Sequence, residues 1–359
     1  MSMTVHPPLF DRPNWNRFMA GYMVRDCTIG FEDGRLGFLL FEELAPDAQM
    51  EDGFQIRLLA VKVGNPLETR FFSLSANALS VGANLSSAWS PLGEFVAVGI
   101  GRHVYGYRPK SHKGREEDIP FEVRRLAPSA YSECGCAILK TVRVGMTVFA
   151  VGGPFRIFQR IGPQEWQEHS EIPIPAELGS SDRETALAAI NASSFEDLAG
   201  LSEEDMYAVG SRGALWRRHQ GRWGRARFPS TRDLHTVAVA PDGTAYVTDH
   251  RGCVWKGKDS EWTQLVEADL SLPYQDSVWF KGRLYCTNDL AGCFVLEEGR
   301  MVAAHRTAHD PMPVRCALHA HRLDVSPDGG RLLVAGMSGA SLYDGRQWHL
   351  LFDGEPDSD

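Results

Sequence analysis

Short apolar runs recur along the chain, and each leads to an aromatic residue. In the two clearest copies, the runs are at 206–210 and 245–249, and a tryptophan follows each run after a glycine-containing turn. A second tryptophan comes seven residues after the first in both copies, at Trp223 and Trp262. Five copies place an aromatic residue at the equivalent position: Tyr105, Phe158, Trp216, Trp255 and Tyr343.

A turn containing proline and glycine precedes several of these runs, at 90–93, 240–243 and 326–329. Proline in the second position and glycine in the last suit a type I turn. Each unit therefore reads as four short strands in an antiparallel meander. Because its middle strands are apolar on both faces, one meander cannot cover itself, whereas meanders packed radially around an axis can. The pattern predicts an all-β propeller in which the five aromatic residues pack between neighbouring blades.

Six such units fit between residues 84 and 352. Further strand-like runs at 37–41, 56–61 and 71–74 supply one more unit. We therefore predict a seven-bladed β-propeller of four-stranded antiparallel blades, with six or eight blades as the alternatives. The domain is expected to span 16–352, between an N-terminal extension at 1–15 and a flexible acidic tail at 353–359.

One segment allows two interpretations. Ser181 with Glu184 three residues later is a capping-box pattern, and the alanine-rich stretch after it favours a short helix. The alternative makes 187–192 the innermost strand of the next blade. We favour the strand, because this unit otherwise lacks one.

Composition narrows the possible functions. The 359-residue chain has a formal net charge of −9, which disfavours nucleic acid as its partner. There is no signal-peptide pattern and no apolar run that could span a bilayer, so we expect a cytoplasmic protein that does not bind membranes. Seven cysteines without small-scaffold spacing fit reduced thiols. We predict no cofactor.

The repeat resembles a known type of protein. The unit built from 208–210, Leu215-Trp216 and 221–223 is similar to the divergent repeats of bacterial propellers of the sialidase-like and photosystem-assembly-factor groups. The resemblance implies the fold. It implies no activity, because the turn at 326–329 lacks the tryptophan that closes a sialidase Asp-box.

Two clusters of polar residues are candidate binding sites. The first holds His305, His309, His319 and His321 in a long segment at 304–321. The histidines lack a tight metal-binding motif, so we expect a polar binding loop without metal.

The second cluster has seven arginines and no acidic residue between 212 and 232. Its candidates are Arg217, Arg218, Arg222 and Arg225. Strand alternation divides these side chains between two faces. The cluster is either the outer surface of one blade or a positive patch for an acidic protein partner.

Two functions fit these features. The first is a monomeric, non-catalytic binding protein whose recognition surface is formed by insertions at about 106–120 and 167–186 and by the segment at 304–321. An acidic cytoplasmic propeller without a catalytic motif resembles an immunity protein that neutralises a bacterial toxin. The alternative is a glycoside hydrolase or lyase with carboxylates in the central channel.

Overall fold

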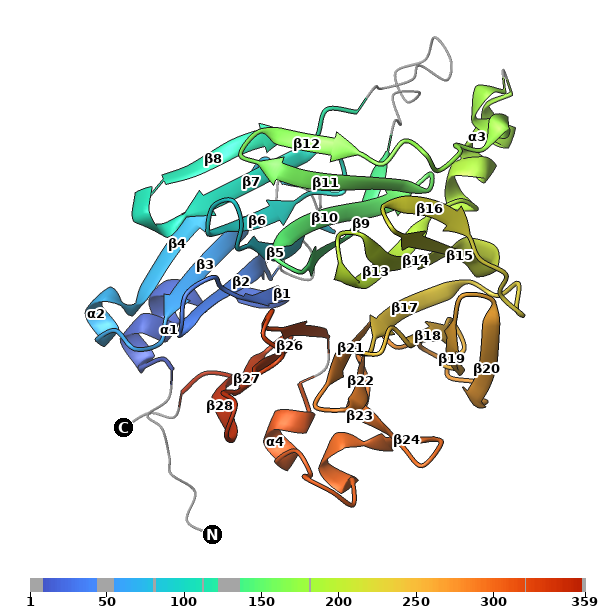
Figure 1. Cartoon of the computed structure of the whole chain (residues 1–359). Coiled ribbons are helices and arrows are strands. Elements are labelled where there is room, and N and C mark those ends of the chain that lie inside the picture. The colour runs from blue at the N-terminus through green and yellow to red at the C-terminus, as the bar shows by residue number, and fades with distance from the viewer. Residues whose placement is uncertain are drawn as a thin grey trace.

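The computed structural model describes residues 9–43, 55–79, 82–111, 113–121, 136–180, 182–319 and 321–356. It contains seven four-stranded antiparallel sheets, each a simple meander in chain order. They are arranged radially as the blades of a propeller (Figure 1). The predicted seven-bladed fold is confirmed.

The first four blades comprise β1 Tyr22–Ile29, β2 Arg35–Glu42, β3 Ile56–Lys62 and β4 Phe71–Ser75; β5 Asn84–Ala88, β6 Glu94–Val98, β7 His103–Arg108 and β8 Lys113–Asp118; β9 Ala137–Val144, β10 Thr147–Gly153, β11 Arg156–Gly162 and β12 Glu165–Glu168; and β13 Phe195–Ser202, β14 Asp205–Gly210, β15 Ala214–His219 and β16 Arg222–Arg225.

The last three blades comprise β17 Leu234–Val239, β18 Ala245–Asp249, β19 Val254–Lys258 and β20 Glu261–Val266; β21 Asp276–Phe280, β22 Arg283–Asn288, β23 Gly292–Glu297 and β24 Arg300–Ala303; and β25 Arg322–Val325, β26 Leu332–Gly336, β27 Gly339–Tyr343 and β28 Trp348–Asp353. The short helices are α1 Arg12–Phe18, α2 Leu67–Arg70, α3 Arg183–Asn191 and α4 Val314–Ala317. None of these helices is long and apolar enough to cross a membrane.

The predicted aromatic residues lie on the third strand of their blades and pack between blades. Phe158 belongs to an apolar cluster that spans the second and third blades, and Tyr343 to one that spans the sixth and seventh. Trp216 is half-buried between the third and fourth blades, and Trp255 is half-buried between the fourth and fifth. Within the described part of the chain, each seam between neighbouring blades has one such cluster, so the blades are held together mainly by apolar packing.

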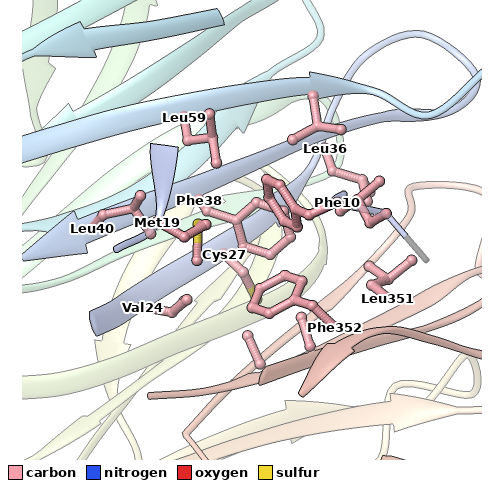
Figure 2. Close-up of a cluster of buried hydrophobic side chains, with 14 of the residues drawn as sticks. Phe10, Met19, Val24, Cys27, Leu36, Phe38, Leu40, Leu59, Leu351 and Phe352 are labelled. Carbon is pink, nitrogen blue, oxygen red and sulfur yellow. The ribbon is translucent and has the colours of Figure 1, made fainter. Parts of the chain in front are cut away.

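The ring closes where the first blade meets the last. The backbone N–H of Val24 donates to the carbonyl of Met337, and that of Leu9 donates to the carbonyl of Leu351. The buried ring of Phe10 stacks on Phe71 at 4.5 Å between centroids. Figure 2 shows how side chains from the N-terminal segment, β1, β2 and β28 meet in this cluster. Leu9 and Phe10, within the predicted extension, therefore help to close the propeller.

Two predictions about local structure are wrong. Residues 187–192, interpreted as a strand, mostly belong to helix α3, whose first turn is capped by Asp182 accepting from the N–H of Thr185 at 3.0 Å. The innermost strand of that blade is β13, in which the polar residues Glu196 and Asp197 interrupt the apolar run that would predict a strand.

The predicted insertion at 106–120 is also misplaced. Residues 113–118 form β8, and the carboxylate of Glu117 is buried against Arg160 at 2.9 Å. The additional residues of this unit follow β8, where 122–135 lie outside the described residues.

Candidate functional site

The propeller has two faces that differ in their connections. The first strand of each blade contacts the first strands of its neighbours, so these strands surround the central axis. Since every blade is an antiparallel meander, the links between blades and the turns between second and third strands share one face. We call this the insertion face, because it carries the segments at 169–194 and 304–321. The opposite, turn face carries the remaining short turns.

Exposed apolar side chains concentrate on the insertion face. Of the eight large hydrophobic residues that are exposed in the described structure, six lie there. Five of the six come from connections of the last three blades, and we call them the apolar patch: Leu272, Leu290, Val314, Leu318 and Met337. Exposed apolar side chains gathered on one face are typical of a protein-binding surface.

Helix α4 is held close to the sixth and seventh blades by two glycines. A Cβ on Gly292 would lie 2.3 Å from the carbonyl oxygen of Ala317, and a Cβ on Gly339 would lie 2.1 Å from the His319 ring. The amide of Asn288 also donates to the carbonyl of Leu272 at 3.0 Å. These contacts fix the backbone beneath much of the apolar patch, so its side chains are presented on a rigid base.

The four candidate histidines do not form one site. His309 is exposed and His305 half-buried, in the part of the segment that packs along the sixth blade. His319 is buried against Gly339, and burial lowers its pKa. His321 is buried and bonds to Asp289 at 2.8 Å. The last two therefore support the fold rather than line a binding loop. No group of three or more potential metal ligands occurs among the described residues.

The candidate arginines divide as strand alternation predicts. Arg217 is buried and pairs with Asp205 at 3.2 Å, whereas Arg218 reaches the opposite side and donates to Nδ1 of His169 at 2.8 Å. Arg222 is exposed near the turn face, and Arg225 is exposed at the insertion-face end of the same strand.

Four exposed arginines lie at the insertion face over the fourth and fifth blades, and we call them the basic sector: Arg212, Arg225, Arg227 and Arg232. Arg225 and Arg227 form no ion pair within the described part of the chain. Of the four arginines in the basic sector, only Arg225 is one of the four candidates named from the sequence.

His169 links the third and fourth blades through a neutral imidazole. Its Nδ1 accepts from Arg218 and from the indole of Trp223, both at 2.8 Å, and its Nε2 lies 3.1 Å from the side-chain oxygen of Gln159. Burial, aided by the Arg218 charge, lowers the pKa of His169 to about 4. The folded protein thus resists protonation at Nδ1, where a proton would displace both donors.

Acidification should therefore destabilise the protein through His169. The unfolded chain takes up this proton near pH 6.5 and the folded protein only near pH 4, so stability falls as pH falls between these values. We expect a loss of about 1–3 kcal/mol, which His169→Gln removes and which unfolding midpoints measured from pH 7 to 4 detect. The exposed-histidine control His219→Gln should retain the full loss, and an equal loss in His169→Gln would contradict the assignment.

A network of charged side chains crosses the central channel. The Lys140 ammonium on the third blade lies 2.8 Å from Asp197 on the fourth and 2.7 Å from Asp276 on the sixth. Arg322 and Asp26 join from the seventh and first blades, 3.9 Å apart. Burial alone disfavours the ammonium, but the two carboxylates outweigh it, and the pKa of Lys140 lies above its usual value.

The same carboxylates also join neighbouring blades. Asp197 accepts from the backbone N–H of Val237 at 2.9 Å, and Asp26 from that of Leu85 at 2.7 Å, in each case on the next blade. Asp276 on the sixth blade likewise accepts from the backbone N–H of Leu323 on the seventh. Asp324 on the seventh blade accepts from that of Ile29 on the first. The aspartates of the channel are thus occupied in holding the innermost strands together. Sequence reasoning missed them, although each is an acidic residue at a similar place in a first strand.

No family model matches the chain. It is 23% identical over 200 residues to the immune protein Tsi7 of Pseudomonas aeruginosa (strain PAO1), in a match that covers 56% of this chain and 59% of that protein. The chain thus spans less than two thirds of the length of this curated relative.

Solved structures with a similar shape include a β-propeller domain. The β-propeller domain of Cps50 (Swd1) from Myceliophteria thermophila aligns over 87% of this chain and 93% of its own, with a TM-score of 0.51 and 10% identity. YCF48 bound to D1 peptide aligns over 72% and 77%, with a TM-score of 0.43 and 14% identity. The likeness to Swd1 supports the fold alone, and the match to Tsi7 is a similarity to an immune protein over part of the chain.

Proposed function

We propose that this chain is a non-catalytic immunity protein that binds a toxin domain on its insertion face. The observation that carries the proposal is the concentration of exposed apolar side chains on the face with the inserted segments. A rigid ring that presents loops is suited to recognition. The sequence match to an immune protein supports the same function.

The basic sector indicates a second feature of the partner, an acidic region. It lies on the same face as the apolar patch, over adjoining blades, in a protein whose net charge is −9. Complementary charges guide association and exclude wrong partners. We therefore propose a toxin domain with an apolar contact region beside an acidic one, bound by a monomer in the cytoplasm.

The alternative, a carbohydrate-active enzyme, would use the channel aspartates. These carboxylates already accept backbone N–H groups and pair with Lys140. A general acid or nucleophile must be able to approach substrate. Their engagement within the protein favours a structural role, and assays for glycoside cleavage distinguish the two functions.

A pull-down from the native cell tests the proposal. We expect the tagged chain to retain one partner in a one-to-one ratio, identified by mass spectrometry. Expression of that partner alone should arrest growth, and co-expression of this chain should restore it. The absence of a stoichiometric partner, or a partner whose expression leaves growth unchanged, would sink the proposal.

The basic sector predicts a dependence on salt. The double variant Arg225→Glu/Arg227→Glu should lower the association rate constant for the partner about tenfold at low ionic strength, and less at high ionic strength, because salt screens exposed charges. Stopped-flow or biosensor kinetics measures this rate. The charge-matched control Arg222→Glu/Arg346→Glu changes residues toward the turn face and should associate as the unaltered protein does. Equal rates for both double variants would place the contact elsewhere.

A further inference from the structure

The central channel also forms a pit that opens on the turn face. Its volume is about 330 Å³, within the range of sites that hold small ligands. The lining reaches from Lys140 and Asp276 at the level of the ion network to Pro241 and Pro327 in turns of the turn face. Among the residues that the structure describes, no connection of the insertion face contributes to the lining. The pit is thus separate from the proposed toxin-binding surface.

The mouth of the pit is apolar. Leu201 lines it with 44% of its surface exposed, and Met146, next to the lining residue Gly145, is 47% exposed. These two are the remaining large exposed hydrophobic residues of the described structure. The half-buried Trp279 also lines the pit, and its ring is held in place by stacking on Tyr246 at 4.9 Å. A concave site with an apolar entrance favours an apolar ligand.

The charged groups deeper in the pit disfavour a charged ligand. Lys140 is paired with two carboxylates, and Arg143 pairs with Asp324 at 2.8 Å and donates to the carbonyl of Val325 at 2.7 Å. The lining has four aspartates against three basic residues, so an anion gains no net attraction. A cation would have to compete with Lys140 and with backbone donors for each carboxylate. Either charge would also lose its hydration.

A neutral polar atom, in contrast, has partners available. The hydroxyls of Thr141 and Ser277 belong to lining residues, are buried in the wall and form no hydrogen bond within the described structure. Hydroxyls can donate or accept a hydrogen bond. Rotation of either side chain toward the pit would let its hydroxyl bond to one hydroxyl or amide on a ligand without breaking the ion network.

We propose that the pit is a second binding site, which takes a small uncharged aromatic molecule bearing one hydrogen-bonding group, such as a phenol. The apolar mouth and Trp279 contact the ring, and the unpartnered polar groups bond to its hydroxyl. This site is independent of the proposed immunity function, because it lies on the opposite face.

Titration with p-cresol tests the proposal. We expect saturable one-to-one binding by calorimetry and ligand-observed NMR. The analogues 4-methylbenzoate and 4-methylbenzylamine, which match its shape but are charged, should bind at least about tenfold more weakly. Absence of saturable p-cresol binding, or equal binding of a charged analogue, would overturn the proposal.

Variants locate the binding. Leu201→Asp and Met146→Asp place a charge at the mouth on exposed positions and should each weaken p-cresol binding about tenfold. Leu290→Asp, the matched change on the insertion face, should bind p-cresol as the unaltered protein does. Unchanged affinity in both mouth variants would overturn the assignment to the pit. Leu201→Asp should still retain the partner in a pull-down, so the two proposals fail separately.

Discussion

Replacement of Lys140 by methionine is expected to lower the free energy of unfolding by about 3–5 kcal/mol, because it leaves two buried carboxylates without their cation. Lys140 bonds to Asp197 at 2.8 Å and to Asp276 at 2.7 Å, on two other blades. Methionine is of similar length and apolar, so the variant changes charge more than packing. Urea unfolding followed by circular dichroism measures the loss.

Two further variants test the cause of this loss. Lys256 is exposed on the outer part of the fifth blade, and Lys256→Met should change stability by less than about 0.5 kcal/mol. Adding Asp197→Asn and Asp276→Asn to Lys140→Met removes the uncompensated charges and should recover part of the loss. A Lys140→Met protein as stable as the unaltered chain would show that the network contributes little.

The sequence predicts the blades well because their second and third strands are buried on both sides. Runs such as β14 and β18 are therefore mostly apolar, and Trp216 and Trp255 recur at fixed places beside them. The first strands surround the channel and must accommodate polar side chains. Asp197 interrupts the apolar pattern of β13, which is why the helical stretch before it was mistaken for the strand.

The candidate site was harder to predict, because residues dense in sequence separate in space. The side chains of His319 and His321 are buried beneath the connection between the sixth and seventh blades, whereas that of His309 is exposed on its surface. Arg217 and Arg218 are adjacent in sequence, but Arg217 pairs with Asp259 of the fifth blade, whereas Arg218 bonds to His169 beside the third. The apolar patch had no local signal, since its members come from four connections that only the ring closure places on one face.

The ion network lies between the two faces of the molecule. Lys140 and its partners join five of the seven blades near the axis, and the pit reaches them from the turn face. The separation makes each face testable by itself. A change on the insertion face should alter partner binding while the pit and the stability of the ring remain intact.

The double variant Leu290→Asp/Leu318→Asp should weaken binding of the toxin partner at least about 100-fold. Apolar side chains near the centre of an interface contribute a large share of its affinity, and a carboxylate there would have to be buried without a partner. Both side chains are exposed, at 79% and 60%, so the change should leave the unfolding midpoint in place. Biosensor titration with the partner recovered from the native cell measures the affinity.

The matched control is Leu201→Asp, an exposed leucine changed in the same way on the turn face. It should bind the partner with unaltered affinity. If the patch is the contact surface, Leu290→Asp/Leu318→Asp should also fail to restore growth when co-expressed with the toxin, because protection requires the complex. Full protection by this variant would mean that the toxin binds elsewhere on the ring, and equal losses in both variants would mean that the introduced charge acts nonspecifically.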